Sequence, residues 1–182
     1  MNDQIDLPEP GSAAVKRVVI VPYDDAWPER FEAERRVLSA VFAGTDVRIE
    51  HVGSTAVPGL AAKPIVDIMI GVSNLAEIEQ RIAALEAGGY RYVPEYEAQL
   101  PERRYLRKPR LGPGVFHLHG VVTGSAFWVR QLVFRDYLRA HPESAAAYEA
   151  LKRELASRLD RTAYTDAKGP FIEGILAAAG SR

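Results

Sequence analysis

The stretch HVGSTAVPGLAAKPIVDIMIG, residues 51–71, decides the fold predicted for this chain. An apolar segment leads into Gly53 and Ser54, and a second apolar segment, residues 65–72, carries the lone acid Asp67. A Gly-Ser pair after a strand leaves backbone N–H groups and a hydroxyl available to phosphate oxygens. An aspartate on the neighbouring strand can place a divalent cation against those oxygens. The stretch therefore indicates a site for a phosphate-bearing ligand.

The rest of the chain predicts a mixed α/β sheet followed by a helical C-terminal part. Apolar runs and alternation predict strands at residues 17–21, 47–52, 65–72, 90–93, 104–108 and 115–122. Asp25 is suited to cap a first helix, and a second helix is predicted over residues 75–87. The turn residues 112–114 favour a hairpin. From Ser125 onward we expect three helices, ending near residues 140, 159 and 179.

Composition favours an ordinary globular domain. The chain has 182 residues, 47% of them hydrophobic and 26% charged, and a formal net charge of −1, so no global field attracts nucleic acid. It has no cysteine, which excludes disulfides and thiolate metal sites. It has no apolar run near the ~20 residues of a membrane span and no signal pattern, which favours the cytoplasm. We expect a flexible leader at residues 1–16 and one domain at 17–182, with a core at 17–124 and C-terminal helices at 125–180.

The segment HVGSTAVPGLAAKPIVDI resembles the signature of the GrpB family, a bacterial group within the nucleotidyltransferase superfamily. Other stretches resemble the same family: VPYDDAWPERFEAE, YRYVPEYEAQLPERRYLRK, FHLHGVV, FWVRQLVFRDYLRAHPE, YEALKRELA and YTDAKGPFIEGIL. The resemblance spans residues 18–176. The resemblance implies a nucleotidyltransferase-like fold of the α/β (α+β) class. It has a mixed sheet with flanking helices, and the C-terminal helices close one side of a cleft.

Met69 departs from the superfamily pattern, which has an acid, an apolar residue and a second acid. Met69 stands where the second acid is expected, two residues after Asp67 and on the same strand face. A thioether is a poor ligand for a hard cation, so an ordinary Mg²⁺ site is incomplete. Glu50 and Glu95 are the candidates for a replacement carboxylate.

Three histidines are candidates to share a site with Asp67. His117 and His119 alternate along one predicted strand, and His51 precedes Gly53 by two residues. If these strands adjoin that of Asp67, three imidazoles and a carboxylate converge, a set that suits Mn²⁺ or Zn²⁺ better than Mg²⁺. His119 is then the candidate general base beside a catalytic Asp67. The alternative is that each histidine only hydrogen-bonds a neighbour.

Five cationic side chains are candidate ligand contacts: Lys63, Arg104, Arg107, Arg130 and Lys168. Lys63 either pairs with Asp67 or contacts the ligand. Arg104 and Arg107 belong to a basic run that either clamps phosphates or lies on a solvated hairpin; one short run provides too few phosphate contacts for nucleic acid. Arg130 lies in the apolar arc of its helix, so an internal carboxylate or a ligand is its expected partner. Lys168 either faces the cleft or lies at the surface.

Two arginines on the same helix as Arg130 are expected to be solvated. Arg135 and Arg139 fall on the side opposite to the apolar arc, which a helix usually turns toward water.

The leading hypothesis is a protein that binds a nucleotide or another small anionic ligand and, in its active version, transfers a nucleotidyl group to a small molecule or a protein. A second hypothesis is a catalytically degenerate accessory module, because the chain resembles GrpB segments fused to dephospho-coenzyme A kinase in some bacteria. A third is a metal-dependent hydrolase that uses the histidines. The sequence carries no signal for the oligomeric state.

Overall fold

The computed structural model describes residues 18–108 and 115–180; the predicted leader and the predicted turn at 112–114 lie outside them. Five strands form one mixed sheet in the order β1-β2-β5-β4-β3. β2 and β5 are parallel, and the other neighbouring pairs are antiparallel. The strands are β1 Arg48–Val52, β2 Ile65–Val72, β3 Arg91–Tyr92, β4 Arg103–Lys108 and β5 Val115–Val122.

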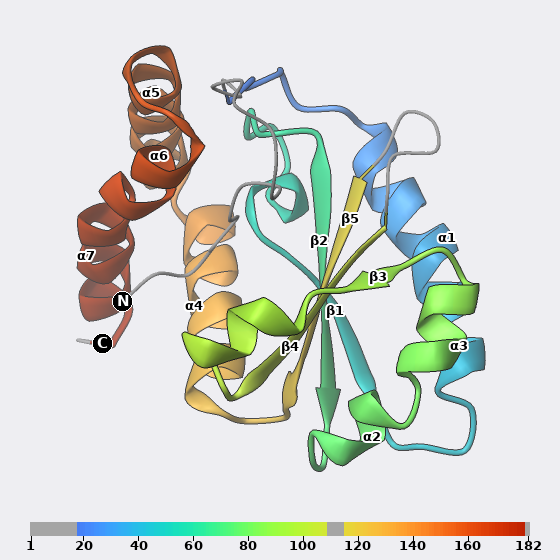
Figure 1. The fold of residues 1–182 in the computed structure, drawn as a ribbon. Coiled ribbons are helices and arrows are strands. Elements are labelled where there is room, and N and C mark those ends of the chain that lie inside the picture. Colours follow the sequence, from blue (N-terminus) through green and yellow to red (C-terminus); the bar gives the residue numbers. More distant parts are fainter. Residues whose placement is uncertain (1–17, 109–114, 181–182) are drawn as a thin grey trace.

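Helices cover both faces of this sheet (Figure 1). α1 and α3 lie on one side, α4 lies on the other, and α5, α6 and α7 lie beyond α4. The helical elements are α1 Ala26–Val41, η1 Ser54–Ala56, α2 Ala76–Glu79, α3 Ile82–Ala87, η2 Pro94–Ala98, α4 Ala126–Ala140, α5 Pro142–Arg158, α6 Arg161–Ala167 and α7 Gly169–Gly180. None of the helices in the described residues combines the length and apolarity that crossing a membrane requires.

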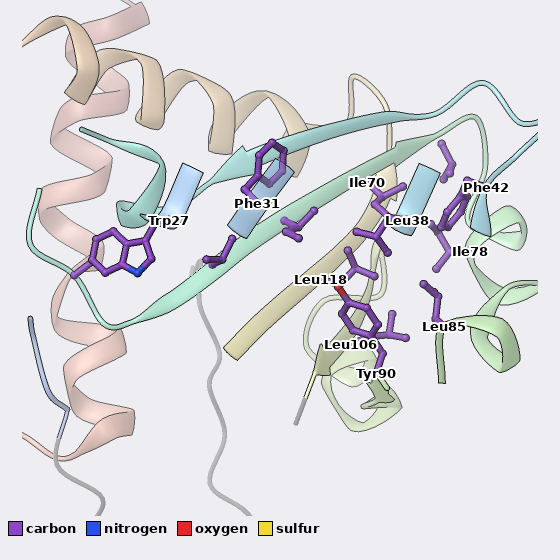
Figure 2. Packing of buried hydrophobic residues seen from close by; sticks show 14 residues of the cluster. Trp27, Phe31, Leu38, Phe42, Ile70, Ile78, Leu85, Tyr90, Leu106 and Leu118 are labelled. Atoms are coloured by element: carbon purple, nitrogen blue, oxygen red, sulfur yellow. The ribbon is translucent and has the colours of Figure 1, made fainter. Parts of the chain in front are cut away.

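The largest core lies between the sheet and helices α1 to α3 (Figure 2). Ile68 and Ile70 of β2 contribute to it together with Phe31 and Leu38 of α1. Side chains alternate along a strand, so Asp67 and Met69 belong to the opposite face. We call the side of the sheet that α1 covers the α1 face, and the opposite side the α4 face. Because both faces of β2 are covered, the expectation of a central buried strand is confirmed.

Met69 lies in the apolar packing between the α4 face and α4. It is 0% exposed and clusters with Val121, Phe127 and Trp128. Gly71 makes room for the Trp128 ring, because a Cβ atom at Gly71 would lie 2.6 Å from the nearest carbon of that ring.

The C-terminal helices pack on the loop between η1 and β2. Val57 and Leu60 of this loop are buried against Leu138 of α4, Tyr148 of α5 and Ile172 of α7. This apolar contact fixes α5 and α7 beside the segment that follows the Gly-Ser turn.

Four local expectations differ from the structure. The side chain of Asp25 does not cap α1, and the N–H of Ala26 donates to Oδ1 of Asp24 instead. The predicted strand at 17–21 contributes only an isolated bridge, from Val21 to Ala62. The predicted helix at 75–87 is broken into α2 and α3 at Arg81, whose φ of −108° and ψ of 1° leave the helical region. The C-terminal part has four helices rather than three in the described residues, because Arg161–Ala167, which were not predicted to be helical, form α6.

The tight contact at Gly71 predicts that Gly71→Ala destabilises the fold by about 1–3 kcal/mol, because the added methyl group overpacks the α4 face. Gly174→Ala is the matched control: it lies in α7 with nothing within 4 Å of its Cβ position, and alanine there should stabilise the helix by roughly 0.5–1 kcal/mol. Urea unfolding of both variants measures the difference. A Gly71→Ala midpoint equal to that of the wild type would contradict this packing.

Candidate functional site

The turn after β1 brings the backbone against Asp67. Gly53 has φ 72° and ψ −173°, a conformation that favours glycine. A Cβ atom there would lie 2.6 Å from Oδ2 of Asp67, so no larger residue fits without a shift. η1 begins immediately afterwards at Ser54. The structure therefore places the Gly-Ser turn directly beside the carboxylate, as the sequence predicted.

Asp67 is held by two imidazoles of the neighbouring strand. The register of β2 and β5 sets Asp67 opposite His117 and Met69 opposite His119. Oδ1 of Asp67 lies 3.4 Å from Nδ1 of His117 and 3.5 Å from Nε2 of His119. All three side chains are buried. Asp67, His117 and His119 were expected to lie together on adjacent strands, and they do.

Arg103 determines the protonation of His119. Its Nη1 lies 3.3 Å from Nδ1 of His119, and a guanidinium only donates hydrogen bonds, so Nδ1 accepts and the ring proton sits on Nε2, toward Asp67. Burial lowers the pKa of His119 to about 4, which keeps the ring neutral. Arg103 is itself buried and packs over the rings of Tyr105 and Phe127.

Asp67 remains ionised in this setting. Burial alone would raise the pKa of the Asp67 carboxyl, but the hydrogen bonds from His117 and His119 outweigh burial and hold the pKa below its ordinary value. The buried carboxylate is thus a fixed negative charge at neutral pH.

A cleft opens beside Asp67 and gathers lysines from three parts of the chain. Lys63 comes from the loop before β2, Lys152 from α5 and Lys168 from the junction of α6 and α7. The chain has only five lysines, so three of them in one cleft is a strong concentration of charge. The other polar residues that line the cleft are Ser54, Thr55, Asp67 and Tyr164.

Lys152 is the most enclosed of the three lysines. It is 2% exposed, its ammonium donates a hydrogen bond to the carbonyl oxygen of Ala61, and burial lowers its pKa to about 7. On the same helix, Glu149 accepts a hydrogen bond of 3.0 Å from the N–H of Ala61. α5 therefore holds both backbone groups of Ala61, in the loop that connects the Gly-Ser turn with β2.

Arg135 and Arg139 hold the other end of this segment from α4. Arg139 donates two hydrogen bonds to the carbonyl oxygen of Ala56, at 2.9 and 2.7 Å. Arg135 donates to Glu50 at 2.7 Å and to the carbonyl oxygen of His51 at 2.9 Å. The expectation of a solvated side chain is wrong for Arg135, which is buried because β1 covers α4 on a second side. Arg139 is exposed, as expected, although its guanidinium also holds the Ala56 carbonyl oxygen.

His51 does not join the cluster at Asp67. It is opposite Ile68 in the β1–β2 register, which places it on the α1 face. Its ring stacks on Phe31 with centroids 4.8 Å apart, and its Nε2 lies 3.0 Å from the hydroxyl of Thr55. The expected convergence of three imidazoles with Asp67 is therefore wrong.

The predicted arginine contacts are dispersed. Arg104 is opposite Gly120 on the α1 face and forms an ion pair of 2.7 Å with Glu79, so it does not belong to the cleft. Arg107 is opposite His117, which places it on the α4 face with Asp67. Arg130 forms a two-pronged ion pair with Glu173 of α7, at 3.1 and 2.8 Å. Glu173 thus supplies the internal carboxylate that was one of the two partners expected for Arg130.

The donor set does not fit a Mg²⁺ ion held by paired carboxylates. Asp67 supplies one carboxylate, Met69 fills the second position with buried sulfur, and Glu50 is paired with Arg135. Over the described ranges 18–108 and 115–180, no group of three His, Asp or Glu side chains is arranged to hold a metal ion. The excess of positive charge, from three lysines and Arg103, suits an anion instead.

The chain is similar to one family of proteins over nearly its whole length. Residues 17–178 match the family model described as GrpB protein. A UPF0157 protein of Streptomyces coelicolor is 40% identical over 174 residues, which cover 94% of this chain and 89% of that protein. The crystal structure of the conserved protein GrpB from Enterococcus faecalis matches with a TM-score of 0.79 and 35% identity, over 88% of this chain and 96% of that chain.

Some relatives are longer than this chain. The UPF0157 protein YqkA of Bacillus subtilis is 36% identical over 159 residues, 87% of this chain but 44% of that protein. A dephospho-CoA kinase of Mycolicibacterium paratuberculosis is 32% identical over 179 residues, 85% of this chain and 44% of the kinase. The chain thus spans less than half the length of these two relatives.

A more distant likeness identifies the fold. The Cid1 poly(U) polymerase, in a structure with Mg and 3′-dATP bound, matches with a TM-score of 0.52 and 12% identity over 81% of this chain and 49% of that chain. The predicted nucleotidyltransferase-like mixed α/β fold is therefore confirmed. With the family model covering nearly the whole described chain, the protein belongs to the GrpB family.

Proposed function

We propose that this GrpB-family protein binds a nucleotide or another phosphate-bearing ligand in the cleft beside Asp67. The observation that carries the proposal is the convergence of Lys63, Lys152 and Lys168 on one cleft that also contains the hydroxyl groups of Ser54 and Thr55. Ammonium groups and hydroxyls are the donors that phosphate oxygens need, and they are worth most where they are partly shielded from water.

The charges in the cleft set the orientation of such a ligand. The carboxylate of Asp67 repels phosphate oxygens, so the phosphates lie toward the lysines. Asp67 accepts hydrogen bonds only, and it is suited to a hydroxyl or amino group of the same ligand. A nucleotide carries both kinds of group, which is why we place it first among anionic ligands.

Nucleotidyl transfer is the second candidate, and the fold likeness to Cid1, which binds nucleotides with Mg, favours it. If the protein transfers a nucleotidyl group, Asp67 and His119 are the proposed catalytic residues. Two observations favour binding over transfer: Met69 removes the second hard ligand, and both ring nitrogens of His119 are already engaged by Arg103 and Asp67. A metal-dependent hydrolase would have to use His117 and His119 alone, because His51 lies on the α1 face.

An accessory role linked to coenzyme A biosynthesis is a further form of the binding hypothesis. It rests on the dephospho-CoA kinases that contain a segment similar to this chain. Dephospho-coenzyme A carries an adenylate group and a pyrophosphate, which match the ligand chemistry of the cleft. This ligand therefore belongs in the binding panel beside the nucleoside triphosphates.

The first functional prediction concerns the lysines. A nucleoside triphosphate or dephospho-coenzyme A at a hundredfold excess over its dissociation constant should stabilise the wild type by ~2.7 kcal/mol, visible as a raised melting temperature. The double variant Lys63→Gln/Lys168→Gln should weaken binding by at least about tenfold, because each lost charged hydrogen bond contributes about 1.5–3 kcal/mol.

Arg158→Gln is the matched control, since Arg158 is an exposed cation on α5 whose partner is Glu154. It should bind like the wild type. Equal affinity in the lysine double variant and in the control would remove the cleft from consideration.

The second functional prediction separates binding from transfer. With Mg²⁺ alone, we expect no pyrophosphate release from any nucleoside triphosphate, because a single carboxylate binds Mg²⁺ weakly. If a softer ion supports activity, Mn²⁺ or Zn²⁺ is the expected one. Asp67→Asn should retain phosphate binding, since it removes a negative charge from the cleft.

Pyrophosphate release is measured with each metal in turn across hydroxyl and amine acceptors. Robust Mg²⁺-dependent release that Asp67→Asn abolishes would establish the enzyme and refute the reading of the site as degenerate.

A further inference from the structure

Building on the proposed function, we infer that the cleft recognises the polyphosphate part of its ligand without a divalent cation, through Lys152, which takes up a proton as the ligand binds. This assigns to the buried lysine of α5 the role that a metal ion has where two carboxylates are present.

The three lysines line one cleft, and two of them lie over the same aromatic ring. The Nζ atom of Lys168 lies 4.7 Å from the centre of the Tyr164 ring, and that of Lys63 lies 5.8 Å from the same centre. Lys152 lines the same cleft and lies 4.9 Å from the Tyr148 ring. Such a group of like charges is relieved when a polyanion binds, and a ligand with several phosphate oxygens fits it better than a monoanion.

The environment of Lys152 makes its charge depend on the ligand. Burial is the main cause of its lowered pKa, and Arg153 and Lys63 lower it further. Glu149 is the carboxylate that opposes this effect, but it already accepts hydrogen bonds from the Ala61 N–H at 3.0 Å and from Arg153 at 3.0 Å. Asp67, Lys168 and Tyr164 complete the ionisable groups around the same cleft.

The sign of the pH effect follows from this setting. Near pH 7 a large fraction of Lys152 is uncharged in the free protein, because its pKa is about 7. A bound polyanion favours the ammonium form, so binding raises the pKa and takes up protons. Polyphosphate affinity should fall as the pH rises above about 7, and the uptake should vanish well below it, where Lys152 is already charged.

A divalent cation has little to contribute in this cleft. Once Lys152 has taken up its proton, three ammonium groups face one carboxylate, and Arg103 lies behind that carboxylate through His119. A second carboxylate is replaced by the buried sulfur of Met69. Among the residues that line the cleft, a divalent cation would find one carboxylate, that of Asp67, and it would add to the positive charge of the lysines.

The first test is isothermal titration calorimetry with inorganic pyrophosphate, in EDTA and in Mg²⁺. We expect an affinity in EDTA that is at least as high as in Mg²⁺, which sequesters free pyrophosphate, and a loss of at least about tenfold in Lys152→Met, since the apolar side chain keeps the packing and removes the charge. Arg158→Gln is the control on the same helix and should match the wild type. The melting temperature of each variant verifies that it is folded.

The second test uses only the wild-type protein for its readout, so it stands even if Lys152→Met fails to fold. The Cε resonances of the five ¹³C-labelled lysines are followed against pH, with Lys152 assigned from Lys152→Arg. Sulfate, which does not titrate in this range, is the probe. The Lys152 resonance should titrate near pH 7 in the free protein and at a higher pH with sulfate.

The outcomes separate the two proposals. Pyrophosphate binding that appears only with a divalent cation, or a Lys152 resonance that titrates near 10 with and without sulfate, would overturn the inference and leave the proposed phosphate site standing. No binding of pyrophosphate or nucleotide under any condition would overturn both.

Discussion

Burying the ionised carboxylate of Asp67 in a strand covered on both faces is very costly unless donors surround it. His117 and His119 supply those donors from β5, and the parallel register that pairs β5 with β2 brings them there. Arg103 on β4 then fixes His119 in the tautomer that donates to Asp67. The order of the three strands β2, β5 and β4 is thus the order of a chain of hydrogen bonds that ends at one buried charge.

The helical C-terminal part completes the site rather than merely covering it. α4 and α5 hold the loop between the Gly-Ser turn and β2 by its own backbone groups, through Arg139 at Ala56 and through Lys152 and Glu149 at Ala61. The same helices and the α6–α7 junction bring two of the three lysines to the cleft. Loosening α5 would therefore change the geometry of the turn and the charge of the cleft together.

The sequence predicted the sheet and the neighbourhood of Asp67 because both depend on short-range patterns. Residues 65–72 form an almost wholly apolar run, and the alternation of His117 with His119 fixes a shared face whichever strand lies beside them. The Gly-Ser turn was predicted for the same reason. Lys168 was found from helical spacing, and it does line the cleft.

The positions of other residues could not be predicted, because they depend on which segments pair in space and a single sequence does not show this. His51 was misplaced because its face depends on the β1–β2 register, which sets it opposite Ile68. Arg135 and Lys152 were missed because an apolar arc marks only one buried side of a helix, and α4 and α5 are also covered on another side. A lysine between Leu151 and Arg153 gives no sign that its neighbour in space is Ala61.

A crystal structure with a nucleoside triphosphate bound in the absence of divalent cations would show directly how the cleft holds phosphate. We expect phosphate density against the ammonium groups of Lys63, Lys152 and Lys168 and the hydroxyl of Ser54, with no metal ion between the phosphates and Asp67. Phosphates bound elsewhere, or a ligand that enters the cleft only with a cation coordinated by Asp67, would contradict this expectation.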